Sequence, residues 1–368
     1  MMILVCVGDF RDSMFNYKKN LLAACCFLAA DAYSLELMDD ESLSVETGQS
    51  LFNSNTVTNG SMTFFRLMVD AELQLNMNIN KVALGCDGPN GTGVCDIDID
   101  RLRLAGTSAS SASDSGPGTD FMMRRPFLEF AIKNNNVAAT RQVSGIRFGA
   151  LESLGSMSFG ENPGNNAADD FGLNRFSGDM NVTLLNTTMS NVKACLGVLV
   201  FGVCGGINLS GSANVASHNQ SFTLSRATKI NDIGPMSAFS NNIFPFGLPT
   251  TLSNTHLLDQ SLDTLHQIIV EDPSSGGQPT KDFYIGLQKE SVNWQKISTG
   301  SFAGVAAQQG WWLSVPKVVI EDITSNQLIQ LGTFAAAVGI IGFAVNINGP
   351  LELGQRPVDN CWGTLTFC

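Results

Sequence analysis

The sequence predicts a mainly β protein: a sandwich, a barrel or an irregular β-solenoid of many short strands, with few short helices and three local disulfides. Three observations predict this class. Apolar and polar residues alternate over short runs, which is the period of a half-buried strand. Gly, Asn and Ser separate these runs, as turns between strands do. Of the nine cysteines, the six after residue 32 fall into three close pairs. About a dozen short strands pack most economically as one of these all-β architectures.

The alternation is clearest over Leu73–Ile79 and Cys95–Asp100. In the second run the apolar positions change parity, because Leu102 and Leu104 stand where 101 and 103 would continue the pattern. A bulge or bend near Asp100 and Arg101 is therefore expected.

The same two patterns, alternation for strands and Gly, Asn or Ser clusters for turns, predict the remaining segments. Gly106–Thr119 and Glu271–Thr280 are expected to be loops, and Phe239–Thr264 a long loop or one short helix. Further strands are expected over Phe127–Ile132, Ser144–Leu151, Asp179–Leu185, Gly206–Ala216, Gln220–Leu224, Asp282–Lys289, Trp311–Glu321 and Phe334–Leu353.

The N-terminal region carries a secretory signal pattern. Lys18 and Lys19 precede the apolar run Leu21–Ala30, and Ala30-Asp31-Ala32 supplies the small residues of a cleavage site. The competing interpretation, a buried N-terminal helix, does not explain this coincidence. The run is shorter than the ~20 residues that span a bilayer.

Four segments follow from this pattern. Residues 1–13 are an extension before the natural start at Met14, and residues 14–32 are the signal peptide. Residues 33–52 form an acidic leader, and residues 53–368 form a β-rich body in which two subdomains would meet near 225–265. In the leader, Asp39 or Asp40 would cap a short helix that carries Leu43 and ends at Gly48.

Charge limits the partners. The formal net charge is −12 over 368 residues, and residues 1–32 contribute none of it. An acidic chain repels polyanions, so we expect no nucleic-acid partner, and anionic lipid surfaces are poor partners. Only 15% of the residues are charged, so Asn, Ser, Thr and Gly supply the polar surface, as is common in exported β proteins. The most apolar later segment, Phe334–Val345, is too short for a transmembrane helix.

The cysteine spacing favours local disulfides. Cys86 and Cys95, Cys195 and Cys204, and Cys361 and Cys368 are the three close pairs. Six cysteines allow about fifteen connectivities, and local pairing is the most natural. A metal site is the rival interpretation, but the chain has no Cys-x-x-Cys and only three histidines, which are His218, His256 and His266.

Asp96, Asp98 and Asp100 resemble the start of a calcium loop. However, Arg101 stands where such a loop has Gly, and Thr107 where it has Glu. A polar strand face is the favoured interpretation, and calcium is the only cofactor that the sequence suggests.

No catalytic motif is present. The chain lacks a Gly-x-Ser-x-Gly elbow, a phosphate loop, a dinucleotide fingerprint and a His-Glu-x-x-His pair, so we expect no enzyme. Trp311-Trp312 is either a ligand platform or one core ring beside one edge ring, the second being favoured. The apolar run Cys195–Cys204 is either an interaction patch or, as favoured, a core hairpin.

The leader Leu37–Gln49 (Leu-Met-Asp-Asp-Glu-Ser-Leu-Ser-Val-Glu-Thr-Gly-Gln), placed directly after a signal peptide, resembles the N-terminal region of the FilA-like pilus-system proteins of Gram-negative bacteria. Glu46 and Ser50 depart from the usual leader. Similar stretches in the body are Ile97–Leu104, Phe127–Asn134, Ser144–Gly149, His266–Val270, Phe283–Glu290 and Gly310–Pro316.

This resemblance implies a structural or accessory role in a pilus or fimbria-like surface filament, with no catalytic residues. Expected partners are other pilus-system or envelope proteins and the chain itself, and the expected location is the periplasm, the outer-membrane surface or the extracellular space. Strand edges, Phe334–Val345 and the leader residues Leu37, Asp39, Asp40, Leu43, Gly48 and Gln49 would mediate assembly. Two alternatives stay open: an adhesin that presents the loop Gly106–Thr119, and a polysaccharide-cleaving enzyme, which requires clustered carboxylates.

Overall fold

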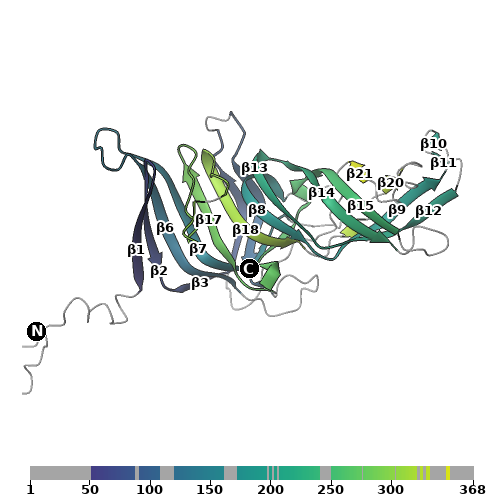
Figure 1. The fold of residues 1–368 in the computed structure, drawn as a ribbon, viewed down its shortest axis with the longest axis horizontal. Coiled ribbons are helices and arrows are strands. Elements are labelled where there is room, and N and C mark those ends of the chain that lie inside the picture. The colour runs from purple at the N-terminus through teal and green to yellow at the C-terminus, as the bar shows by residue number, and fades with distance from the viewer. Residues whose placement is uncertain are drawn as a thin grey trace, which may run out of the picture. The chain divides into compact units, whose positions relative to one another are not determined.

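The protein divides into two units, Met1–Ser50 and Leu51–Cys368, and the second contains everything that the structure describes. The computed structural model (Figure 1) describes residues 51–87, 91–107, 120–160, 172–196, 199–200, 203–204, 207–240, 250–275, 277–302, 304–320, 324–325, 329–331 and 345–348. Within these ranges the chain is mainly β, as the sequence predicts. The helices described are two 3-10 turns, η3 (Leu262–Thr264) and η4 (Pro273–Ser275).

The larger sheet has twelve strands. Its main path runs β1 (Phe52–Asn59), β2 (Met62–Val69), β6 (Phe121–Lys133), β7 (Gln142–Ser158), β16 (Gln267–Val270), β18 (Gly310–Ile320), β8 (Leu173–Leu184), β5 (Ile97–Ala105) and β4 (Met77–Leu84). Off this path, β3 (Glu72–Leu75) pairs with β6, β13 (His218–Ala227) pairs with β8, and β17 (Thr280–Gln288) pairs with β7 and β18.

The smaller sheet has seven strands. They are β19 (Thr324–Ser325), β9 (Thr187–Leu196), β12 (Ile207–Val215), β14 (Lys229–Ser240), β15 (Thr250–Ser261) and β21 (Val345–Asn348) in order, with β20 (Ile329–Leu331) beside β9. A separate hairpin joins β10 (Leu199–Val200) to β11 (Val203–Cys204).

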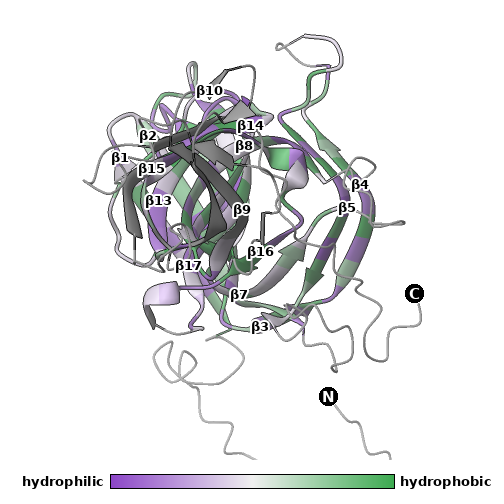
Figure 2. Cartoon of the chain, turned by 90° about the vertical axis from the view of Figure 1, so that its right-hand side faces the viewer, coloured by the Kyte–Doolittle hydropathy of each residue, from purple (hydrophilic) through white to green (hydrophobic). Residues whose placement is uncertain are grey.

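The pairings of the larger sheet close a ring. β7 pairs with β17 and β5, β17 with β18, β18 with β8, and β8 with β5. All of these pairs are antiparallel except β18 with β8, which is parallel. Figure 2 shows hydrophobic and hydrophilic residues alternating along β4 and β5 of this sheet. The alternation sends one set of side chains into a core and the other set away from it.

One hydrophobic core joins the two sheets. Ile97, Phe121 and Val315 of the larger sheet belong to the same buried cluster as Met236 and Leu257 of the smaller sheet. The predicted junction at 225–265 contains the end of β13, all of β14 and β15, and so strands of both sheets.

Most expected strands are confirmed, and one expectation is wrong. The expected long loop or single short helix over Phe239–Thr264 is wrong for most of its described residues, because β15 occupies Thr250–Ser261 and pairs antiparallel with β14, and the 3-10 turn η3 covers only Leu262–Thr264. The sequence pattern did not indicate this strand, because the polar residues Asn254, His256 and Asp259 interrupt its apolar positions. The expected strand Phe334–Leu353 lies mostly outside the described residues, which include only β21 within it.

The expected bend after Asp100 is present. Arg101 has a φ of 49°, in the left-handed region that L residues rarely adopt. Ile97 and Ile99 are buried before it, whereas Leu102 is buried after it and Leu104 packs partly buried against the same core. The apolar positions therefore change from odd to even at this residue.

The Cys86–Cys95 disulfide is present and joins the segments at the ends of β4 and β5. Next to it, the Asp96 amide donates to the Leu84 carbonyl at 2.9 Å. Cys195 and Cys204 lie in β9 and β11, but their side chains fall outside the described part of the chain, as do Cys361 and Cys368 entirely.

Replacing both Cys86 and Cys95 with Ser is expected to lower the free energy of unfolding by about 2–3 kcal/mol, because the bond closes a short loop and restricts the unfolded chain. Urea unfolding of the variant and the unchanged protein measures this loss. Adding a reductant should destabilise the unchanged protein more than the variant. Equal stability of the two oxidised proteins would contradict the expectation.

Candidate functional site

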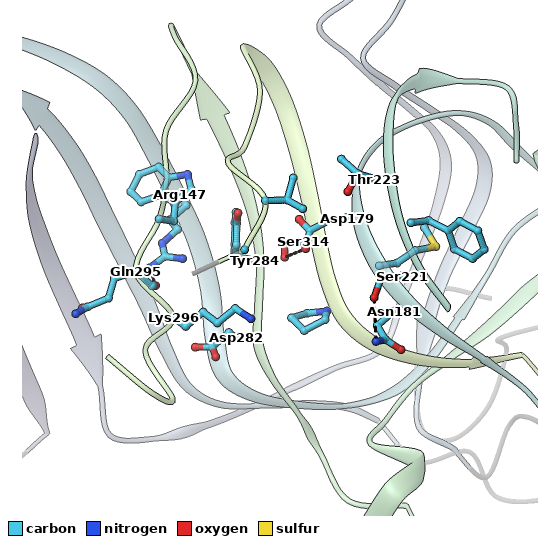
Figure 3. A pocket seen from close by; sticks show the side chains of 16 residues that line it. Arg147, Asp179, Asn181, Ser221, Thr223, Asp282, Tyr284, Gln295, Lys296 and Ser314 are labelled. Carbon is cyan, nitrogen blue, oxygen red and sulfur yellow. Dashed lines mark hydrogen bonds between the residues drawn. The ribbon is translucent and has the colours of Figure 1, made fainter. Parts of the chain in front are cut away.

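A pocket lies on one face of the larger sheet, with a volume of about 230 Å³. Its wall is formed by five strands that are neighbours in the sheet, in the order β7, β17, β18, β8 and β13, and by the segment that links β17 to β18. Figure 3 shows the side chains that converge on it. The lining residues are Arg147, Asp179, Met180, Asn181, Ser221, Phe222, Thr223, Asp282, Tyr284, Trp294, Gln295, Lys296, Gly304, Val305, Ser314 and Pro316.

Strand register explains why these residues meet. Tyr284 lies opposite Ser314, Ser314 opposite Asp179, and Asp179 opposite Thr223. Directly opposed residues on neighbouring strands place their side chains on the same face, in contact or nearly so. One row across four strands thus aligns four polar side chains that lie up to 135 positions apart in the sequence.

A second row, next to the first, carries charge. Arg66 lies opposite Glu129, and Glu129 lies opposite Arg147. All three are buried, with exposed fractions of 7%, 0% and 2% respectively. Glu129 accepts from Arg66 Nε at 3.0 Å and from Arg147 Nε at 2.6 Å, one bond on each carboxylate oxygen. One carboxylate therefore holds two guanidinium groups in the interior.

Gln295 completes this charged cluster from outside the sheet. Its side-chain oxygen accepts from Arg66 at 3.0 Å, and its backbone carbonyl accepts from Arg147 at 2.7 Å. Buried charges require such additional hydrogen bonds, because the removal of water costs several kcal/mol for each ion. The cluster thereby fixes the β17–β18 connection to β2, β6 and β7.

Three aromatic rings surround the Arg147 guanidinium. Its central carbon lies 5.1 Å from the ring centre of Phe127, 4.9 Å from that of Tyr284 and 4.8 Å from that of Trp294. Each ring face attracts a cation. Burial lowers the pKa of the Arg147 guanidinium, and the attraction to Glu129 partly offsets this effect.

Two glycines of β7 make room for these rings. A Cβ at Gly149 would come within 2.9 Å of Phe127 and within 2.2 Å of the Phe283 carbonyl. A Cβ at Gly145 would come within 3.0 Å of Trp294. The stretch Gly145-Ile-Arg-Phe-Gly149 therefore supplies both Arg147 and the space for the rings that surround it.

Asp179 lies on the other side of Tyr284 from Arg147 (Figure 3). Its carboxylate accepts from Trp312 Nε1 at 2.8 Å and from Ser314 Oγ at 3.1 Å. Burial raises the pKa of the Asp179 carboxyl, and these two hydrogen bonds offset the effect only in part. Burial also raises the pKa of the Tyr284 hydroxyl well above its usual value, so Tyr284 stays neutral.

Asp282 is the second carboxylate of the pocket. It has a φ of 63° and accepts from the Ser298 amide at 3.0 Å and from the Ser298 hydroxyl. These bonds anchor the β17–β18 connection a second time. Two acidic residues far apart in sequence thus line one cavity, which no motif in the sequence predicts.

Burial is graded from the floor of the pocket to its mouth. Arg147, Asp282, Tyr284, Trp294 and Ser314 are buried. The exposed lining residues are Ser221, Thr223, Lys296, Gly304 and Val305. Asn181 is half-buried and donates to Ser221 Oγ at 3.1 Å. The pocket therefore opens to solvent through uncharged hydroxyls and one lysine.

The three aspartates of the suggested calcium loop all have hydrogen-bond or ion-pair partners within the protein. Asp96 accepts from Arg226 Nε at 2.8 Å and from the Trp311 amide at 2.9 Å. Asp98 and Asp100 both form ion pairs with Lys81, at 2.5 and 2.9 Å. Within the described ranges, no group of three or more His, Cys, Asp or Glu side chains is arranged to hold a metal ion.

The other predicted site residues lie apart from the pocket. The leader residues 37–49, residues 334–344 and most of the loop 106–119 are outside the described residues. Trp312 is fully buried and Trp311 only half-buried, as the interpretation of one core ring and one edge ring requires. His218, His256 and His266 are bonded to Gln220, Asp232 and the Phe159 carbonyl.

The chain matches no known protein family, and no curated protein or solved structure matches it either. None of the described helices is long and apolar enough to span a membrane. The geometry of the site is thus the only guide to its chemistry.

Glu129→Gln is expected to lower the free energy of unfolding by about 3–5 kcal/mol, because it leaves two buried guanidinium groups without a counter-charge. Urea unfolding measures the loss. Glu72→Gln is the matched control, since Glu72 accepts from Arg124 at the exposed surface, and its effect should be much smaller. Equal losses of unfolding free energy for the two variants would show that the buried cluster stabilises the protein no more than an exposed ion pair does.

Asp179→Asn should gain stability relative to the unchanged protein as the pH rises above the usual carboxyl pKa of 3.8. The pKa of Asp179 is higher in the folded protein than the usual 3.8. Its stabilising contribution is therefore complete below the unfolded-state pKa and lost as the pH rises through the folded-state pKa. Asn does not titrate and avoids this loss.

Asp272→Asn is the control with the opposite sign. Burial raises the pKa of Asp272, but hydrogen bonds from Lys317 and Ser274 outweigh it and lower the pKa overall. The stabilising contribution of Asp272 is therefore complete above its unfolded-state pKa and lost as the pH falls through its lower folded-state pKa. Asp272→Asn should lose stability relative to the unchanged protein as the pH rises towards about 4 from below, and the difference should change little above that pH. Chemical unfolding at each pH gives the free energy of unfolding of both variants. If this free energy depended on pH in the same way in both, the opposite pKa shifts of Asp179 and Asp272 would be refuted.

Proposed function

We propose that this chain is a secreted structural or accessory protein of a bacterial surface filament and acts by assembling with other copies of itself or with envelope proteins. The observation that carries the proposal is β1, an exposed and unprotected strand at the edge of the larger sheet. In Figure 1, β1 lies beside β2 at the purple end of the sheet.

β1 has the properties of an assembly edge. Among the described strands it pairs only with β2, over all eight of its residues. Phe-Asn-Ser-Asn-Thr-Val-Thr-Asn contains no charge and no proline, which are the usual protections of an edge. Seven of the eight residues are exposed. The outward backbone groups of such a strand can pair with a strand of another chain.

The sheet next to β1 also presents an apolar face. Cross-strand pairs align Leu67, Leu128 and Phe148, and in the adjacent row Phe130, Ile146 and Leu287. Leu67, Phe130, Phe148 and Leu287 have exposed fractions of 47%, 37%, 43% and 41%. Contiguous exposed apolar residues are typical of protein interaction surfaces. A partner strand on β1 would extend this face.

The resemblance of Leu37–Gln49 to the leader of FilA-like pilus-system proteins and the secretory signal pattern at 14–32 support the same role. Both favour a location outside the cytoplasm, and the Cys86–Cys95 disulfide supports this, because such bonds persist in oxidising compartments.

Thr56→Lys combined with Thr58→Lys should abolish assembly, because the two charges repel an incoming strand at the edge. Both residues are exposed, so the body should stay folded. Negative-stain electron microscopy of the secreted chain at rising concentration detects filaments or regular oligomers. Ser291→Lys with Thr299→Lys is the matched control, with the same added charge at exposed positions outside β1.

Deletion of residues 33–49 tests the leader separately and should also abolish assembly while leaving a soluble, folded body. Assembly that persists after this deletion would remove the leader from the mechanism. Uniform single particles of the unchanged chain at every concentration would overturn the proposal of self-assembly.

A further inference from the structure

We propose that the pocket beside Arg147 binds an uncharged sugar ring. This ligand site is independent of the β1 edge and of any filament that the chain forms. It lies on the sheet face that carries Arg147 and Asp179, whereas the exposed apolar rows lie on the alternate positions of the same strands.

The donors and acceptors of the pocket define the ligand's groups. Asp179 and Asp282 have carboxylates that accept hydrogen bonds, and each keeps lone pairs beyond its two protein donors. The ammonium of Lys296 only donates, whereas the hydroxyls of Ser221 and Thr223 do both. A ligand that satisfies all of these groups must donate and accept at several points. Hydroxyl groups do this.

The charges of the lining disfavour an ion. An anion would meet the carboxylates of Asp179 and Asp282, and a cation would meet Lys296. The positive charge of Arg147 is already engaged by Glu129 and by three ring faces. An uncharged ligand meets neither repulsion.

Size and apolar surface complete the argument. The pocket, about 230 Å³, is smaller than the ~300–1,000 Å³ of sites for drug-sized molecules, so it suits a single ring. Tyr284 and Trp294 are buried, Pro316 is half-buried and Val305 is exposed, and all four line the pocket and offer apolar contact to the C–H groups of a ring. Apolar walls with a few convergent polar groups are typical of small-ligand sites.

Saturation-transfer NMR on the full chain with D-glucose, D-galactose and N-acetyl-D-glucosamine at millimolar concentration tests this. At least one neutral sugar should receive saturation, and glucosamine and glucuronate, the charged counterparts of the same ring, should bind more weakly. Ser221→Phe and Thr223→Phe fill the exposed mouth and should weaken binding by about tenfold or more.

Ser225→Phe is the matched control, because Ser225 is an exposed serine of β13 that does not line the pocket. It should bind sugar as the unchanged protein does, and circular dichroism checks that all variants are folded. Three results would overturn the proposal: no neutral sugar binds, a charged counterpart binds more tightly, or the filled variants bind as well as the control.

Discussion

The buried triad of Arg66, Glu129 and Arg147 is the constraint on which the described structure most depends. Two cations and one anion without water are tolerated only where each finds its hydrogen bonds. Here β2, β6 and β7 each supply one charge, and Gln295 supplies two acceptors. The three strands cannot slip by one residue against one another, because a slip would send every charge to the opposite face. The triad therefore fixes register on the half of the sheet that ends at β1.

Polar anchors then hold the β17–β18 connection over the sheet. Asp282 accepts a hydrogen bond from Ser298, near the middle of this connection. The β-bridge between Val292 and Ala307 joins the two ends of the connection to each other. Val292, Trp294 and Ala307 pack against Phe64 and Trp312 in a core of their own. The pocket lies where this connection, which packs over Arg147, meets the row from Tyr284 to Asp179.

Much of the fold follows from local patterns, and the site does not. Alternation over Cys95–Asp100 and the slip after it predict both β5 and its bend at Arg101, since burial of every second residue is a local property. β15 was not predicted, because Asn254, His256 and Asp259 interrupt the alternation of apolar and polar residues that is typical of a strand. The pocket needs Arg147, Asp179 and Asp282 on one face, and only the pairing of strands far apart in sequence provides this. The one local signal is the pair Gly145 and Gly149, which flank Ile-Arg-Phe. Glycines in a sequence usually suggest a turn, but here they leave space for closely packed aromatic rings.

The parallel pairing of β18 with β8 has a consequence for the order of folding. A chain that emerges N-terminus first presents β5, β7 and β8 long before residues 310–320 arrive. Until then β8 lacks its parallel neighbour, and β17 lacks the strand that joins it to the ring. Contacts of such long sequence separation form slowly, because the intervening chain must first be ordered. The ring therefore closes only after nearly the whole described chain has been delivered.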